Sequence, residues 1–366
     1  MTPWQERTAS FCERFHLHLP VLLAPMSGVP APSLTIAVAE AGGLGACGAL
    51  LMTPAQIAAW VAAVRATTTR PFQLNLWIPD PLPLRDAGHE ESVRRFLSDW
   101  GPAVAIDAGD ATPPDFSAQC AALLAARPAV ASSVMGLFAP EFVAQLRRLG
   151  IAWFATVTTV AEARLAEAAG ADAIVTQGME AGGHRGCFDA GEAESRQVGL
   201  FALLPAVVDA VRLPVVAAGG IADGRAVAAA LLLGASAVQI GTAFLRCPEA
   251  QIPPAWADAL AVTQPEDTVI TRAFSGRAGR SIATSYVRAA SAAAAPAPAP
   301  YPVQRGLTSA MRVAAAKAGD VARMQAWAGQ AAARARAQPA SVVVRALWQE
   351  AGPLLGGPQT GIREDS

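Results

Sequence analysis

Residues 215–242, VVAAGGIADGRAVAAALLLGASAVQIGT, contain the pattern that decides the fold of this 366-residue chain. A β-branched run, Val215–Ala218, ends in two glycines; an Ala/Leu helical stretch follows and ends at Gly234, and a short apolar run, Ala237–Gly241, comes next. Short buried strands that alternate with helices are typical of a parallel sheet wrapped by helices. This stretch therefore predicts one complete strand–helix–strand unit of an α/β fold.

The same unit recurs eight times, each apolar run being followed by a Gly-, Pro- or Ser-containing loop and an Ala-rich helical stretch. Eight such units predict a (β/α)8 TIM barrel. Helix boundaries are marked locally, since Thr53-Pro54 opens one helix and Thr159–Ala169 ends at Gly170. The predicted strands are Val21–Ala24, Leu44–Cys47, Phe72–Leu76, Val130–Val134, Trp153–Val157, Ala173–Gln177, Val215–Ala218 and Ala237–Gly241.

Two regions interrupt the rhythm of the barrel, which we assign to residues 1–78 and 129–247. Residues 79–128 are too long for one strand-to-helix connection and contain many prolines, so we expect an inserted cap segment over the barrel mouth. Residues 248–340 are expected to form a helical substrate or lid region, and residues 341–366 a C-terminal helix and tail that pack on the barrel.

Finer expectations concern the C-terminal extension. Ala289–Pro302 is a low-complexity Ala/Pro segment and predicts an extended surface loop. Helices are predicted near Gly319–Arg336 and Ser341–Glu350.

Composition excludes several classes of protein. Lys and Arg number 28 against 29 Asp and Glu, and no basic block could neutralise a run of phosphates, so nucleic acid is not an expected partner. The five cysteines form no C-x-x-C pair and have no nearby histidine, which predicts reduced thiols in a cytoplasmic protein and no metal site.

The charged N-terminal stretch lacks the apolar core of a signal peptide. The uncharged stretch between Arg225 and Arg246 is divided by glycine and polar residues, so no membrane span is expected. The sequence leaves open whether the protein is a monomer or a homodimer.

Active sites of such barrels lie at the C-terminal ends of the strands. The seventh predicted strand ends in Ala218-Gly219-Gly220 and the eighth in Gln239-Ile240-Gly241-Thr242. Glycines allow backbone N–H groups to approach an anion closely, and the following helix N-terminus adds a positive dipole end. These two turns predict a phosphate-binding site.

A histidine stands at the mouth of the predicted barrel. His184 follows Gly182 and Gly183 in the loop after the sixth strand, so it has no apolar face to pack against. Because an unperturbed imidazole exchanges protons near neutral pH, a catalytic or substrate-binding role is expected. Arg185 is more simply explained as a solvated residue or as part of a structural ion pair. The remaining histidines, expected to be structural or exposed, are His16, His18 and His89.

Further residues at strand ends favour a flat cofactor. Ala24-Pro25-Met26 ends the first strand with a turn fixed by proline, and Asn75 and Gln177 lie on the third and sixth strands. Each amide can donate and accept, as the ring edge of an isoalloxazine requires, although either one could be a satisfied buried amide. Together with the phosphate site, these residues favour a flat phosphorylated cofactor.

These motifs resemble the nitronate monooxygenases, formerly called 2-nitropropane dioxygenases, over most of the chain except the insertion and the Ala/Pro loop. The string EAGGHRG is highly specific, whereas a Gly-Gly-Ile turn is common to many flavin barrels. The segments that carry the resemblance are Val21–Val29, Ala41–Gly45, Phe72–Leu76, Gln177–Gly186, Ala218–Ile221, Gln239–Leu245, Arg272–Arg277 and Met324–Gln330.

The resemblance implies an activity and a cofactor. FMN would be held noncovalently, with its phosphate at Gly219-Gly220 and Gly241-Thr242 and its ring beside Ala24–Met26, Asn75 and Gln177. An alkyl nitronate would react with O2 to give a carbonyl compound and nitrite. For neutral nitroalkanes, His184 matches the position of the base that removes the α-proton.

The chain departs from the family pattern at strand four. The usual Ser-Phe-x-Phe-Gly is Ser132–Gly136, SSVMG, and only Tyr286 and Tyr301 are present where bacterial members use several tyrosines. We therefore expect a larger pocket and a larger or different acid than a small nitronate.

Other interpretations remain open. An FMN-dependent NAD(P)H reductase of the enoyl-acyl-carrier-protein or quinone type would share the histidine loop, although Arg185 and the C-terminal extension favour the monooxygenase. A non-catalytic flavin-binding protein is a second alternative. A barrel isomerase with a phosphorylated substrate would be colourless.

Overall fold

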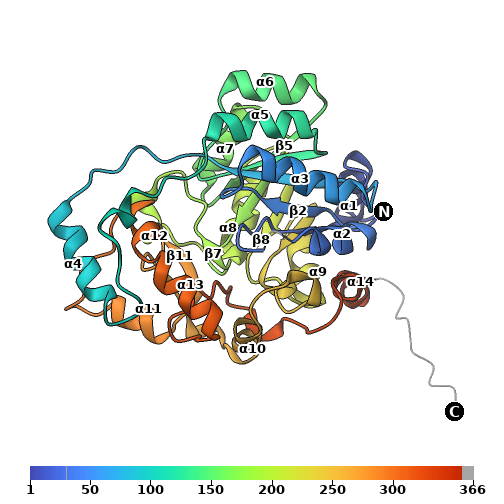
Figure 1. Ribbon diagram of the computed structural model, residues 1–366. Coiled ribbons are helices and arrows are strands. Elements are labelled where there is room, and N and C mark those ends of the chain that lie inside the picture. Colours follow the sequence, from blue (N-terminus) through green and yellow to red (C-terminus); the bar gives the residue numbers. More distant parts are fainter. Residues whose placement is uncertain (30, 357–366) are drawn as a thin grey trace, which may run out of the picture.

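The computed structural model describes residues 1–29 and 31–356 and confirms the predicted TIM barrel (Figure 1). Eight parallel strands lie in the order β1-β9-β8-β6-β5-β4-β3-β2. The ring closes between β1 and β2, where the Leu23 N–H donates to the Leu44 carbonyl at 2.9 Å. The strands are β1 (Val21–Leu23), β2 (Gly45–Gly48), β3 (Phe72–Trp77), β4 (Val130–Val134), β5 (Ala152–Val157), β6 (Ala173–Gln177), β8 (Val215–Ala218) and β9 (Ala237–Ile240).

Helices surround this ring. Thr53 and Thr159 begin two of them with capping boxes, in which the side-chain oxygen accepts the N–H of the residue three positions on. Gly170 and Gly234 follow two helix ends with φ of +92° and +109°, a conformation that favours glycine. The helices that cover the strands are α2 (Pro32–Glu40), α3 (Pro54–Arg65), α5 (Phe116–Ala126), α6 (Pro140–Arg148), α7 (Val160–Ala168), α8 (Leu200–Ala210), α9 (Gly224–Leu232) and α14 (Ala340–Leu354).

The last of these helices completes the barrel. Helix α14 packs against α9 and α2 and so occupies the place of the helix that follows β9, although about 100 residues intervene. The predicted C-terminal helix Ser341–Glu350 thus lies within α14. Helix α5 falls inside the segment 79–128 but packs against α3, α6 and β3, in the helical layer of the barrel.

The N-terminal end of the barrel is closed by apolar side chains. Helix α1 (Pro3–Arg14) brings Phe11 to Phe15 and Phe154, with ring centroids 4.7 and 6.0 Å from that of Phe11. These rings pack with Leu22, Leu44 and other strand residues. Because this end is filled, open space inside the barrel is left at the C-terminal ends of the strands.

A second layer of structure lies at the opposite end. The antiparallel sheet β10-β11-β7 combines β7 (Gly183–His184) with two strands of the C-terminal region, β10 (Thr268–Thr271) and β11 (Gly279–Ile282). Figure 1 shows α4 gathered with α11, α12 and α13 at the left of the molecule. The helices outside the barrel layer are α4 (Ala87–Leu97), α10 (Pro254–Val262), α11 (Ser285–Ala290), α12 (Val303–Leu307) and α13 (Ser309–Ala318).

One predicted helix is wrong. Gly319–Arg336 contains, among elements of three or more residues, only the 3-10 turn η6 (Ala332–Arg334). Residues 326–328 instead extend beside β11, where Ala326 accepts the Ile282 N–H at 3.0 Å and the Ala328 N–H donates to Arg280. The sequence does not predict strands β10 and β11, which also lie in this region. The region after residue 248 is therefore not purely helical.

Among the described residues, no helix is long and apolar enough to cross a membrane. The uncharged stretch before Arg246 consists of α9, a turn and β9, as the sequence predicts.

Candidate active site

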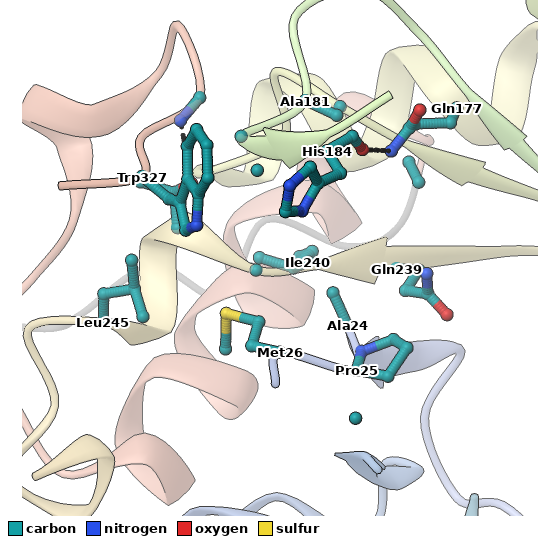
Figure 2. Close-up of a pocket in the computed structure, with 18 of the residues that line it drawn as sticks. Ala24, Pro25, Met26, Gln177, Ala181, His184, Gln239, Ile240, Leu245 and Trp327 are labelled. Atoms are coloured by element: carbon teal, nitrogen blue, oxygen red, sulfur yellow. Dashed lines mark hydrogen bonds between the residues drawn. The ribbon is translucent and has the colours of Figure 1, made fainter. Parts of the chain in front are cut away.

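A cavity opens at the C-terminal ends of the barrel strands, with about 1320 Å³ of atom-free space, part of it open to solvent. It lies between the barrel and the layer that contains β7 (Figure 2). The structure brings together around it every residue that the sequence singled out: Ala24, Pro25, Met26, Asn75, Gln177, Gly182, Gly183, His184, Ala218, Gly219, Gly220, Gln239, Gly241 and Thr242.

One wall of the cavity is made of backbone. Gly219 and Gly220 have φ of +116° and +69°, and a Cβ on Gly219 would lie 3.1 Å from the Ala181 nitrogen. In the described part of the chain, the N–H groups of Gly219, Gly220, Gly241 and Thr242 donate to no protein acceptor. Gly220 is exposed and the other three residues are half-buried, so these unpaired N–H groups face the open cavity, where they suit an anion such as a phosphate.

The N-terminus of α9 contributes less than the sequence suggests. Asp223 accepts the Ala226 N–H at 3.1 Å, and Glu350 of α14 accepts the Gly224 N–H at 3.1 Å. These carboxylates already neutralise the positive end of the helix dipole. The free N–H groups of the two glycine turns, and not this helix end, are the donors left for an anion.

The C-terminal region seals the same wall. The Gly329 N–H donates to the Thr242 hydroxyl at 3.0 Å, and a Cβ on Gly182 would lie 2.5 Å from the Gly329 nitrogen. Only glycine allows these two segments to approach so closely. The turn after β9, the histidine loop and residue 329 therefore meet at one point.

The three amides of the site have different surroundings. Asn75 donates through Nδ2 to the Ser132 hydroxyl at 3.0 Å, and among the described residues its Oδ1 has no partner. Gln239 accepts a hydrogen bond from Gln73 at 3.4 Å. The amide of Gln177 is instead engaged by the histidine loop, which is described next.

Gln177 holds the loop that carries the histidine. Its Nε2 donates to the His184 carbonyl at 3.0 Å, and its Oε1 accepts the Gly186 N–H at 2.8 Å and Arg185 Nη1 at 3.1 Å. Arg185 is 1% exposed and also donates to the Gly178 carbonyl at 2.7 Å. Arg185 is thus a structural residue, but it is neither solvated nor ion-paired as the sequence predicts, because its partners are backbone and amide oxygens.

His184 lies inside an aromatic frame. Its ring centroid is 4.9 Å from the rings of both Trp77 and Trp327, and its Nε2 is 2.8 Å from the Ser275 hydroxyl. Strand β7 pairs with β11, which places Gly279 opposite His184. Figure 2 shows His184 and Trp327 on one side of the cavity, with Met26 and Ile240 across from them.

Burial and nearby cations keep the imidazole neutral. Desolvation, followed by the guanidinium groups of Arg277 and Arg305, lowers the pKa of His184 from 6.5 to about 3. Arg277 is 1% exposed, forms an ion pair with Asp80 and donates to the Cys187 carbonyl at 2.6 Å. At neutral pH the ring is therefore unprotonated and keeps a nitrogen lone pair that can accept a proton.

The family model described as nitronate monooxygenase matches residues 9–350. The chain belongs to the nitronate monooxygenase family. It is 40% identical over 342 residues to a nitronate monooxygenase of Paraburkholderia phytofirmans, covering 90% of this chain and 92% of that relative.

Solved structures agree. The nitroalkane oxidase from Streptomyces ansochromogenes superposes with a TM-score of 0.85 at 39% identity, covering 93% of this chain and 98% of that one. FabK from Thermotoga maritima is more distant, with a TM-score of 0.74 and 26% identity over 95% of this chain and 97% of that one. The chain is therefore an oxidoreductase of the nitronate monooxygenase family built on a TIM barrel.

The sequence did not reveal the aromatic frame of this family member. Strand four does lack aromatic residues, and Val134 and Met135 line the cavity there. The aromatic walls come instead from Trp77 and Trp327, and Tyr301 stacks on Trp77 with ring centroids 5.1 Å apart. Trp77 directly follows the predicted third strand, and this position at a strand end is a signal in the sequence. Trp327 falls in the helix that the sequence wrongly predicts over Gly319–Arg336.

Proposed function

We propose that this protein oxidises alkyl nitronates with O2 to a carbonyl compound and nitrite, using FMN. The observation that carries the proposal is a neutral histidine, framed by two tryptophans, that faces a cavity whose other wall presents unpaired backbone N–H groups. Membership of the nitronate monooxygenase family supports the same substrate class.

The residues of the backbone wall fit FMN. The glycine turns at Gly219-Gly220 and Gly241-Thr242 would receive its phosphate, because their N–H groups have no protein acceptor. The ring would lie beside Ala24–Met26 and Asn75, whose free Oδ1 can accept a hydrogen bond. When bound, FMN supplies the electron acceptor for the nitronate and the electron donor for O2.

His184 would act on substrates that arrive as neutral nitroalkanes. A carbon acid must lose its α-proton to become a nitronate, and the neutral imidazole can take that proton. The nitronate formed is an anion, which stabilises the protonated ring beside it. Nitronates supplied as anions need no such step.

We further infer a cytoplasmic enzyme with a small-molecule substrate. The five cysteines are free, with Cys47, Cys187 and Cys247 buried, as expected for a reducing compartment.

An anaerobic absorbance titration tests the proposal against its rivals. The yellow holoenzyme is mixed separately with ethyl nitronate and with NADH. Loss of the oxidised flavin spectrum with nitronate alone supports the monooxygenase. Bleaching only by NADH would indicate an NAD(P)H reductase, and no response to either compound would indicate a non-catalytic flavin-binding protein. A purified protein without flavin would contradict all three hypotheses.

A further inference from the structure

Ser275 joins the catalytic histidine to the C-terminal region. It lies in the turn between β10 and β11 and is 1% exposed. Its hydroxyl is 2.8 Å from His184 Nε2, although 91 residues separate the two in the chain. The same hydroxyl donates to the Arg277 carbonyl at 3.1 Å and accepts the Arg277 N–H at 3.3 Å.

The hydrogen bonds of this hydroxyl favour one tautomer of the imidazole. A serine hydroxyl has one hydrogen and two lone pairs. The hydrogen is directed to the Arg277 carbonyl and one lone pair receives the Arg277 N–H. With the hydroxyl oriented in this way, one lone pair is left to receive the Nε2–H of His184, and the ring then carries no hydrogen on Nδ1.

Nδ1 is free to act. Among the described residues, His184 makes no hydrogen bond through Nδ1, and the residue lines the cavity. A neutral imidazole with hydrogen on Nε2 has its lone pair on Nδ1, the atom that can accept a proton.

We propose that Ser275 is a positioning residue that holds His184 in the Nε2–H tautomer, so that Nδ1 takes the α-proton of neutral nitroalkanes. This inference rests on the proposed function, and it goes further in naming the proton-accepting atom and the residue that selects it. In the transfer, the α C–H bond breaks, its electron pair moves into the C=N bond of the nitronate, and the proton goes to Nδ1. Ser275 then accepts from an imidazolium that is a donor at both nitrogens.

Other residues hold the His184 ring and its loop in place, so the effect of Ser275 on proton transfer can be measured separately from its effect on structure. Trp77 and Trp327 flank the ring, and Gln177 and β11 fix the backbone of the loop. Removing the hydroxyl therefore leaves the ring in place but free to change its tautomer or turn over. The loss is confined to proton transfer and spares the binding of the cofactor or of a nitronate.

The test compares two substrates in the holoenzyme. For Ser275→Ala, kcat/KM for nitroethane should fall by about 10- to 100-fold, while kcat/KM for ethyl nitronate stays within about 3-fold. The deuterium isotope effect with α-deuterated nitroethane should rise, because proton abstraction becomes more rate-limiting. Ser275→Thr, which keeps the hydroxyl, should recover most of the nitroethane rate.

Ser236→Ala is the matched control. Ser236 is a buried serine immediately before β9 that neither lines the cavity nor contacts His184 through a hydrogen bond. Its variant should keep both rates, and the flavin absorbance and thermal midpoint of each variant report correct folding.

The outcomes are distinct. Equal loss of both activities in a folded, flavin-loaded Ser275→Ala enzyme, or no loss of either, would overturn the inference. A wild-type holoenzyme that oxidises no nitronate contradicts the proposed function itself.

Discussion

The two walls of the cavity are built in different ways. The barrel wall consists of glycine turns, Gly219-Gly220 and Gly241-Thr242, and offers backbone N–H groups. The opposite wall consists of side chains, His184 between two tryptophans, held by a sheet that includes strands from the C-terminal region. A phosphate can be bound by any backbone of the right shape, whereas proton transfer needs one side chain in one orientation. The comparison implies that cofactor binding and proton transfer can be disabled separately.

The largest expected effect is on the side-chain wall. His184→Asn should lower kcat/KM for neutral nitroalkanes by about 10²- to 10⁴-fold, because a general base contributes that much. Flavin content and the oxidation of preformed nitronates should remain within a few-fold of wild type. Steady-state rates with nitroethane and ethyl nitronate measure the difference, and equal nitroethane activity in the variant would remove the base assignment.

The backbone wall is tested by Gly220→Asp. The added carboxylate would face the phosphate, and a repulsion of about 2 kcal/mol corresponds to a Kd for FMN raised ~30-fold. Gly220→Asn is the control, because it imposes the same side-chain bulk at φ +69° without the charge. Fluorescence titration of the apoprotein with FMN measures both. Equal affinities of the two variants would count against a phosphate at this turn.

Gln177 lies at the cavity between the two walls, and the sequence and the structure give its amide different partners. The sequence predicts that its amide meets the flavin ring, whereas the structure engages that amide with the backbone of His184 and Gly186 and with Arg185. Gln177→Leu should therefore lower the free energy of unfolding by about 1–3 kcal/mol, since it leaves buried groups unpaired. Its Kd for FMN should stay within about 3-fold of wild type in the same titration. A large loss of flavin affinity with unchanged stability would restore the ring contact.

The smallest effect concerns pH and stability. Burial lowers the pKa of His184 to about 3 in the folded protein. As the pH falls below about 6.5, His184 therefore becomes protonated in the unfolded chain but stays neutral in the folded protein. The free energy of unfolding should fall over this range for wild type and fall less for His184→Asn. Urea unfolding at pH 7 and pH 4 measures the difference, and parallel losses in both proteins would contradict the lowered pKa.

The sequence predicts the barrel because its signals are local. Short apolar runs ending in glycine turns fix each strand to within a residue or two, as at Val130–Val134 and Val215–Ala218. The failure at Gly319–Arg336 has a physical cause. This Ala-rich stretch has a high helix propensity, but its buried Ala326 and Ala328 pair with β11, and tertiary pairing overrides propensity.

In the site, as in the fold, the features set by local sequence could be predicted and those set by long-range pairing could not. A glycine turn at the end of a strand is visible in a few consecutive residues, so the whole backbone wall could be predicted. The partners of His184 could not, because Ser275 and Trp327 reach it only through the pairing of β7 with β11 and of residue 327 with Ser281. No local pattern marks a serine in a turn as the neighbour of a histidine 91 residues earlier.

The pairing of β7 with β11 also sets an order of assembly during synthesis. A ribosome that has released the chain as far as Cys247 has delivered every strand of the barrel and both glycine turns, but neither β11 nor Ser275 nor Trp327. The nascent chain at that stage contains both glycine turns of the barrel wall and a histidine loop without its partner strand. The proposed proton transfer therefore requires that the last third of the polypeptide has docked on the barrel.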